Sequence, residues 1–381
     1  MIRNLGGTWT MAFLSWEKTE PTDGNFAWSA LDGALQGCQV PGLSIFGVLA
    51  DAPSWAAKVP SGEEIEKATD VAQLRPQPRP DFPAQYARAL TAAAQRYAPV
   101  IPVWGALDVD RYAPDAVGQV LRASRAALEQ ALPVARLVGE VRSPAPGQAA
   151  GPPPGAAEVA EICYPDLDAP LSWDVDRDRA RLEAYRGSLG QAAAKPLWVR
   201  NWLRSGEKAG PGEPPAPPAE APPCGLTPAL DSPGARGPML GDAGDLARLL
   251  LAERALGVEH IGWALLRDYG SERAGLLTAD GSPQPAACAF ATVCDLLAGS
   301  RFLRDDSDAA ARRLVFSTPD GRQVVAAWKR GDAPASVAVA DPAATEVVSL
   351  LGAHRPAGAT HDAGTVALGE NPVYLVTGAA R

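Results

Sequence analysis

Two polar residues follow apolar runs of the sequence at points where chemistry is expected. Asp108 comes directly after VIPVWGAL at 100–107, and Asn201 lies near the end of KPLWVRNW at 195–202. Such β-favouring runs predict buried strands, and in parallel α/β folds the carboxyl ends of strands carry the functional residues. Asp108 is therefore a candidate proton donor, with a loop cap or a solvated carboxylate as the structural alternative. Asn201 is a candidate partner for ligand hydroxyl groups, or simply a turn former.

Four tryptophans lie close to the ends of predicted strands, where an indole ring is able to stack on a ring of a ligand. They are Trp16, Trp104, Trp202 and Trp263. Core packing is slightly favoured for Trp16 and Trp263. Trp202 lies beyond the apolar part of its strand, so it is the better candidate for a ligand contact.

Further carboxylates and the metal-binding residue types give weaker signals. Glu140 and Glu161 lie on other predicted strands and offer an alternative carboxylate pair, although Glu161 falls in mid-strand. The three histidines form no recognisable triad with a serine, and the five cysteines include no C-x-x-C pair. We therefore expect no metal site, no cofactor and no disulfide framework.

Strands and helices alternate along the first 299 residues. Apolar runs predict strands at 8–16, 42–50, 100–107, 134–141, 158–164, 195–202 and 260–266. Amphipathic runs predict helices at 29–39, 83–98, 114–132, 177–192, 242–257 and 284–299. This order is typical of right-handed βαβ units, so we expect a parallel sheet flanked by helices.

Residues 300–381 differ in pattern from the rest of the chain. They contain short β-type runs such as RQVVAAWKR, which are separated by Gly, Pro, Asp and Asn turns. This pattern predicts a small antiparallel β-sandwich. Two Pro/Gly-rich segments, 143–157 and 205–241, are predicted to be exposed loops, and the first stands where a helix should connect two strands.

The composition excludes some classes of partner. The chain is 46% hydrophobic and 21% charged, which is ordinary for a soluble globular protein. A formal net charge of -9 without a basic stripe argues against nucleic acid. No apolar run approaches the roughly 20 residues that span a bilayer. Met1 opens no signal peptide, so we expect a cytoplasmic chain as written; a truncated start would leave a secreted or periplasmic location open.

One string near the N-terminus is specific. LSWEKTEPTDGNFAWSALD at 14–32 has the pattern W-x-x-x-E-P-x-x-G-x-F-x-W-x-x-L-D. It resembles the segment after the second barrel strand of clan A glycoside hydrolases, closest to the family 39 β-xylosidase-like type. The string at 260–290 resembles the eighth strand of that family and the loop after it, and is also fairly specific. Weaker likenesses to the third, fourth and seventh strands fall at 42–57, 82–104 and 195–202, and 300–381 resembles the C-terminal sandwich. The resemblance therefore covers essentially the whole chain.

The resemblance implies a TIM-barrel-like enzyme that acts on oligosaccharides or polysaccharides by a retaining mechanism with two glutamates. Its acid/base position falls on Asp108, which is one methylene shorter than glutamate. Its nucleophile position falls on Asn201. An amide is a poor nucleophile and carries no charge to stabilise an oxocarbenium ion.

Other site positions of the family are replaced as well, while Tyr164 keeps the tyrosine of the His-x-Tyr motif and becomes a substrate-binding candidate. The replacements of an arginine, an asparagine, a histidine and an aromatic residue are Met11, Leu107, Ile162 and Ala264. The scaffold positions are kept, namely Glu20-Pro21, Gly24, Asp32, Pro53, Trp55 and Gly275. This pattern predicts that the double-displacement machinery is gone while the fold remains.

We therefore expect a (β/α)8 TIM-barrel-like domain over residues 1–299, without a first strand if the start is authentic, and a C-terminal antiparallel β-sandwich over 300–381. The expected function is carbohydrate binding with lost or strongly reduced hydrolysis. Two alternatives stay open. One is an active O-glycosyl hydrolase that uses Asp108 as acid, with a non-standard second carboxylate or an inverting water. The other is a protein-interaction scaffold that binds its partner through 205–241.

Overall fold

The computed structural model describes most of the chain and divides it into two compact units. The described residues are 2–36, 39–58, 77–106, 114–141, 155–164, 175–202, 238–264, 266, 275–357 and 364–378. The first unit, here called the barrel unit, comprises Thr8–Pro170 and Ala180–Arg200. The second, here called the C-terminal unit, comprises Met1–Gly7, Leu171–Arg179 and Asn201–Arg381.

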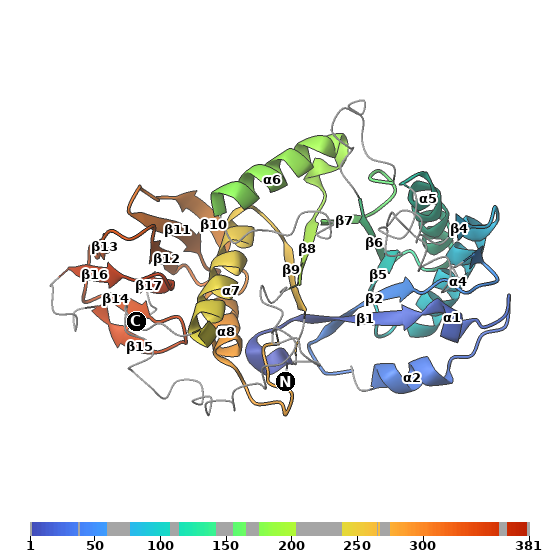
Figure 1. Cartoon of the computed structure of the whole chain (residues 1–381), viewed down its shortest axis with the longest axis horizontal. Helices are drawn as coiled ribbons and strands as arrows, with labels where there is room; N and C mark the ends of the chain where they lie inside the picture. Colours follow the sequence, from blue (N-terminus) through green and yellow to red (C-terminus); the bar gives the residue numbers. More distant parts are fainter. Residues whose placement is uncertain are drawn as a thin grey trace, which may run out of the picture. The chain divides into compact units, whose positions relative to one another are not determined.

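A parallel sheet forms the centre of the barrel unit (Figure 1). Its strands pair in chain order: β1 (Trp9–Ser15), β2 (Ser44–Ala50), β5 (Val103–Ala106), β6 (Arg136–Glu140), β7 (Glu161–Tyr164) and β8 (Leu197–Trp202). The register sets Ser15 beside Ala50, and Glu140 beside Cys163. Since all these strands run the same way, their carboxyl ends meet at one edge of the sheet.

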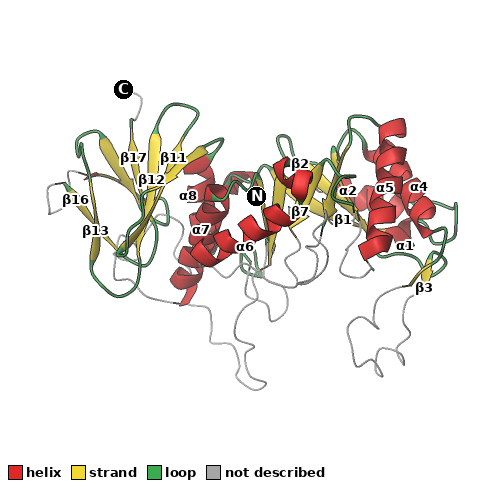
Figure 2. Cartoon of the chain, turned by 90° about the horizontal axis from the view of Figure 1, so that it is seen from above, coloured by secondary structure: helices red, strands yellow, loops and turns green. Residues whose placement is uncertain are grey.

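Helices follow most of these strands. They are α1 (Trp16–Thr19), α2 (Ser29–Gln36), α4 (Phe82–Tyr97), α5 (Pro114–Ala131) and α6 (Val175–Ser188), with a 3-10 turn at Gly190–Ala194 and a small β3 (Ala57–Lys58)–β4 (Gln77–Pro78) pair. The helices α4 and α5 pack side by side (Figure 2). The Tyr86 hydroxyl of α4 donates to the Leu49 carbonyl of β2 at 2.8 Å, which ties this helix layer to the sheet.

The two faces of the sheet have different neighbours. One face, here called the inner face, carries an apolar cluster of Phe46, Val48, Val103, Val138, Cys163 and Trp198, with Trp9 and Met11 packed against it. Alternation along a strand gives Phe13 and Glu140 the same face. The opposite face meets the helices, since a Cβ added to Gly139 would lie 3.1 Å from the Leu121 side chain of α5.

The connection from β6 to β7 differs from the others. Its described part, 155–160, forms turns and contains no helix. The ammonium of Lys195 donates to the carbonyls of Ala156 and Ala157 at 2.9 and 3.0 Å, and to that of Val159. One lysine thus binds three carbonyl groups that a helix would have satisfied internally. The rest of the predicted loop at 143–157 lies outside the described residues.

The C-terminal unit contains η1 (Ile2–Leu5), α7 (Pro238–Ala255), β9 (His260–Ala264), α8 (Pro285–Leu297) and an antiparallel β module. Six strands of the module pair in the order β10 (Arg301–Asp305), β11 (Ala311–Ser317), β12 (Gln323–Lys329), β17 (Val373–Thr377), β14 (Thr345–Val348) and β15 (His354–Pro356). The strands β13 (Ala335–Ala338) and β16 (Thr365–Leu368) form a separate antiparallel pair. This confirms the predicted β-sandwich.

The larger sheet of the module has a core on each side. One core joins Phe316 and Tyr374 to side chains of α7 and α8 such as Leu246 and Leu296. The other joins Val347 and its neighbours to β13 and β16. The helices α7 and α8 therefore share a core and a compact unit with the β module.

The cysteines depart from expectation at one position. Cys288 of α8 is disulfide-bonded, whereas the scattered cysteines predicted no disulfide framework. Cys163 and Cys294 are free, and burial raises the pKa of the Cys294 thiol to about 12. Among the described residues, no helix is long and apolar enough to cross a membrane.

Candidate active site at the carboxyl ends of the barrel strands

The two positions predicted to carry catalysis lie at the limits of what the structure describes. Asp108 lies outside the described residues, two positions after the end of β5 at Ala106. Asn201 and Trp202 are the last two residues of β8, and only their backbone is described. The prediction that KPLWVRNW forms a strand is thus confirmed, with Asn201 at the strand's carboxyl end.

Trp16 lies in a cluster of aromatic rings that includes Tyr86 of α4 and Trp55. It is fully buried, and its ring centroid is 5.5 Å from that of Trp55 and 5.4 Å from that of Tyr86. Its indole N–H donates to the Glu20 carboxylate at 2.7 Å. A ring with no exposed face offers no stacking surface, so this geometry fits the core role that was slightly favoured for Trp16.

Trp104 and Tyr164 point toward the helices. Trp104 is fully buried, and its indole N–H donates to the Ile101 carbonyl at 3.1 Å. The Tyr164 ring packs edge-on against Tyr185 of α6, with centroids 4.9 Å apart. Their strand neighbours Val103 and Cys163 belong to the inner face. As placed, both candidates belong to the layer between sheet and helices.

Trp263, the last aromatic candidate, lies on β9 of the C-terminal unit. It is partly exposed and packs against the core that α7 and α8 share with the β module. These contacts fit the core-packing role that the sequence slightly favours for Trp263 over a ligand-binding role.

The residues of the string at 14–32 make a set of buried structural contacts. The fully buried Glu20 carboxylate accepts hydrogen bonds from the Trp16 indole and from the Gly24 backbone N–H, both at 2.7 Å, and pairs with Arg88. The Trp55 indole donates to the Glu20 carbonyl at 3.0 Å. Gly24 has a φ of 79°, which favours glycine. The spacing of Trp16, Glu20 and Gly24 therefore allows the buried Glu20 carboxylate to accept hydrogen bonds from both of the other residues.

The end of the same string forms a second contact. Arg96 of α4 donates to both oxygens of Asp32, at 3.0 and 2.6 Å, and the Tyr97 hydroxyl donates to Asp32 at 2.8 Å. The hydrogen bond from Arg96 lowers the pKa of Asp32, and burial raises the pKa of Tyr97 to about 12. Arg96 also lies 5.5 Å from the centre of the Trp28 ring. Trp28 and Asp32 therefore attach α2 to α4.

Glu161 lies in the amino-terminal half of the inner face, where its carboxylate has an ion-pair partner and a hydrogen-bond partner. Buried Glu161, the first residue of β7, pairs with Arg136 and accepts a hydrogen bond from the Trp198 indole. The Trp198 ring lies 4.8 Å from the ring of Trp9 and 4.9 Å from that of Phe46. Glu161 therefore belongs to the stabilising end of the strands, which weakens its candidacy as a catalytic carboxylate.

Phe13 and Glu140 lie in the carboxyl-terminal half of the inner face. Phe13 of β1 is 56% exposed, although it is a large apolar side chain. Glu140, the last residue of β6, is 6% exposed and lies on the same face by strand alternation. Glu140 is one of the candidate carboxylates predicted from the sequence, whereas Phe13 is not among the predicted candidates. Alternation along the run 8–16 places Trp9, Met11 and Phe13 on one face of the strand, and this pattern could have identified Phe13 from the sequence.

The described residues contain no group of three or more metal-ligating side chains that could hold an ion. What this edge of the sheet offers is an aromatic ring, a carboxylate and apolar walls. Such a set can hold an organic ligand by stacking and by accepting hydrogen bonds from hydroxyl groups.

Comparison with known proteins finds similarity in structure. Neither a protein-family model nor a curated protein sequence matches the chain. A family 39 glycoside hydrolase from Bacteroides cellulosilyticus matches with a TM-score of 0.70 and 17% identity, over 99% of this chain and 76% of the other.

Two further solved structures are similar over most of their length. The catalytic domain of a family 30 xylanase C from Talaromyces cellulolyticus has a TM-score of 0.59 and 13% identity, over 99% and 90% of the two chains. A glucosidase from Croceicoccus marinus has a TM-score of 0.56 and 12% identity, over 100% and 91%. The chain therefore has a TIM-barrel-like fold with a C-terminal β-sandwich, and its fold is similar to that of clan A glycoside hydrolases.

Proposed function

We propose that this chain binds carbohydrate and that its double-displacement hydrolysis is lost or strongly reduced. The supporting observation is Asn201. It lies at the carboxyl end of β8, on the strand whose sequence resembles the seventh strand of family 39 enzymes, where the family has its nucleophilic glutamate. An amide there cannot form the glycosyl-enzyme ester of a retaining mechanism.

The loss extends beyond one residue. Met11 lies on the inner face, at the position where the resemblance implies an arginine that orients the nucleophile. Methionine has neither charge nor a hydrogen-bond donor. The scaffold contacts around Glu20 and Asp32 are intact in contrast. Retained packing, together with the absence of a nucleophilic carboxylate at 201 and of an arginine at 11, supports ligand binding without turnover.

The first test measures binding and turnover of the same sugars. Xylotriose and cellobiose are titrated calorimetrically and then incubated with the protein at high concentration. We expect saturable binding, no hydrolysis products, and weaker binding in Trp202→Ala, because Trp202 is the last residue of β8 and its indole ring is the proposed stacking surface. The exposed Val134 before β6 supplies the control Val134→Ala, which should bind like the wild type. Binding of neither sugar would contradict the proposal.

A further inference from the structure

The inner face of the barrel unit becomes exposed toward the carboxyl ends of β1 and β2. Phe46 and Val48 in the middle of β2 are 3% and 5% exposed, whereas Phe13 of β1 is 56% exposed. The next inner-face positions, Ser15 and Ala50, are partly exposed. A large apolar side chain that remains in water gives up hydrophobic stabilisation. The inner face is thus packed in the middle of these strands and accessible at their carboxyl ends.

Asp51 directly follows β2 and has an unusual backbone conformation. Its φ of 55° is left-handed, and among the described residues it is the single non-glycine residue with a positive φ. Aspartate tolerates this conformation better than most residues, but it still costs free energy, and such strain is concentrated at functional sites. The backbone is held in place, because the Asp51 carbonyl accepts a hydrogen bond from the Glu17 N–H at 2.9 Å. The strain therefore lies in a fixed part of the barrel unit, at the carboxyl end of a strand.

Two polar groups at this end of the strands are available to a ligand. The Asp51 side chain is exposed, and its carboxylate has no hydrogen bond or ion pair with the part of the chain that the structure describes. Ser15 precedes α1 at the N-cap position, but its hydroxyl forms no cap hydrogen bond. Serine at this position normally binds a backbone N–H of the helix. Both groups thus keep their hydrogen-bonding capacity where the strands end.

The register brings these groups close to the exposed ring. Ser15 is paired with Ala50, which places Asp51 beside the end of β1. Phe13 lies two residues before Ser15 on the same face, about 7 Å away along the strand, and the distance across to β2 is about 5 Å. An aromatic ring, a hydroxyl and a carboxylate therefore share the carboxyl edge of two neighbouring strands, where barrel folds bind their ligands.

We propose that Phe13, Ser15 and Asp51 form a carbohydrate subsite, in which the aromatic ring stacks on a sugar ring and the two polar groups bind its hydroxyls. The Asp51 carboxylate accepts hydrogen bonds, while the Ser15 hydroxyl is able to donate or accept. A sugar suits both kinds of group, since it has apolar C–H faces and hydroxyl donors. A metal ion would need more ligands than the described residues gather, and an apolar ligand would bury the carboxylate without hydrogen bonds. This subsite rests on the proposed function and names residues that the resemblance does not.

Calorimetric titration with xylotriose and cellobiose tests the subsite. Phe13→Ala should weaken the affinity about tenfold, as expected for the loss of one stacking ring. Asp51→Asn should also weaken it about tenfold, because asparagine tolerates the left-handed backbone but lacks the charged acceptor. Ser15→Ala should weaken it about threefold through the loss of a neutral hydrogen bond. The matched controls Leu303→Ala and Asp332→Asn change exposed residues of the C-terminal unit and should bind like the wild type.

Thermal unfolding of the same proteins separates binding from structure. The three site variants should keep a midpoint close to that of the wild type. Asp51→Gly should unfold at a higher temperature and still bind weakly, because glycine removes the backbone strain together with the carboxylate. A midpoint for Asp51→Asn well below that of the wild type would make the carboxylate structural and overturn its part.

The binding results separate the subsite from the proposed function. Wild-type affinity in Phe13→Ala and Asp51→Asn, alongside weaker binding in Trp202→Ala, would overturn the subsite and leave the proposed function standing. Absence of binding by the wild type would overturn the proposed function and the subsite together.

Discussion

At the scale of single residues, the string at 14–32 combines a family signal with a structural purpose. Glu20 joins Trp16, Gly24 and Arg88, and Asp32 joins Arg96 and Tyr97. None of these contacts requires a ligand. These residues therefore act in packing within the fold.

Glu20 should therefore be a stability residue. Glu20→Ala removes an acceptor from two buried donors and from Arg88, and we expect the free energy of unfolding to fall by about 3 kcal/mol. Urea denaturation followed by tryptophan fluorescence measures this change. Glu17→Ala, an exposed carboxylate of the same helix α1, is the control and should change stability little. Equal effects of the two variants would refute the role of Glu20.

Aromatic residues show where sequence reasoning reached its limit. Trp16 and Trp104 are candidates because they lie close to strand ends, and Tyr164 because of the family resemblance, yet each of them packs toward the helices. A strand end specifies the edge of the sheet but not the face. The face follows from alternation along the whole strand, which gives Phe13 the same face as Met11. Without this alternation applied to the run 8–16, Phe13 is not among the candidates predicted from the sequence.

At the scale of elements, hydrophobic periodicity was sufficient for most of the chain. The run predicted as a strand at 8–16 forms β1, and the run predicted as a helix at 83–98 forms α4, with ends shifted by one or two residues. The strand predicted at 158–164 is confined to Glu161–Tyr164, because residues 155–158 form the turn that Lys195 holds. The contact between Lys195 and this turn joins residues far apart in the sequence, so the local hydrophobic pattern cannot predict it.

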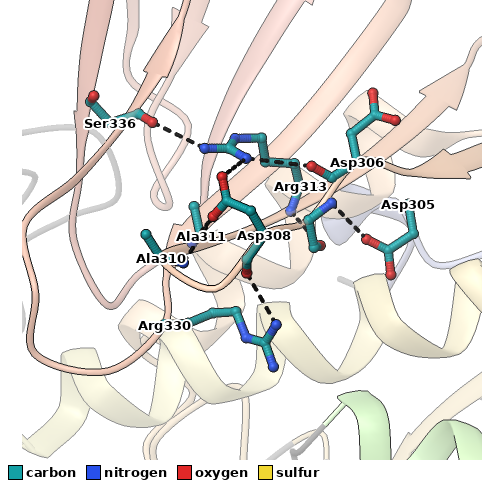
Figure 3. Close-up of polar contacts among 9 residues, drawn as sticks. Asp305, Asp306, Asp308, Ala310, Ala311, Arg313, Arg330 and Ser336 are labelled. Atoms are coloured by element: carbon teal, nitrogen blue, oxygen red, sulfur yellow. Dashed lines mark hydrogen bonds and ion pairs between the residues drawn. The ribbon is translucent and has the colours of Figure 1, made fainter.

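The turn between β10 and β11 is an element whose stability should depend on pH (Figure 3). The Asp308 carboxylate accepts hydrogen bonds from Arg313 at 2.7 Å and from the backbone N–H groups of Ala310 and Ala311 at 2.8 Å. Arg330 donates to the Asp308 carbonyl at 3.1 Å. The hydrogen bond from Arg313, together with those from the backbone, lowers the pKa of Asp308 to about 2.

The sign of the pH effect follows from this shift. The folded-state pKa of Asp308 is below its unfolded value of about 3.9, so its contribution is complete above about pH 4 and is lost as pH falls through 2. Asp308→Asn should therefore be less stable than the wild type at pH 7, and the difference should disappear near pH 2. Urea denaturation at several pH values measures it.

Two further results decide that prediction. Arg313→Gln should show a smaller pH dependence, because the main cause of the shift is removed. A difference between Asp308→Asn and the wild type that stays constant from pH 7 to pH 2 would contradict the assignment.

At the scale of the whole molecule, the chain has a fold similar to that of clan A glycoside hydrolases, and we propose that its reaction centre is changed. The TM-score of 0.70 to a family 39 enzyme reflects the strand order and the β-sandwich, which apolar side chains determine. The proposed loss of activity rests on two residues, Asp108 and Asn201. Substitution of two polar residues at strand ends leaves packing almost untouched, so loss of chemistry need not cost stability.

The measurement that tests this account most directly is hydrolysis of an aryl β-xyloside by the wild type, by Asp108→Ala and by the double variant Asp108→Glu with Asn201→Glu. We predict no turnover above background by the wild type and measurable, retaining hydrolysis by the double variant. If both stay silent, the loss of activity stands and extends to the replacements Met11, Leu107 and Ile162. Turnover by the wild type that disappears in Asp108→Ala would contradict the central claim.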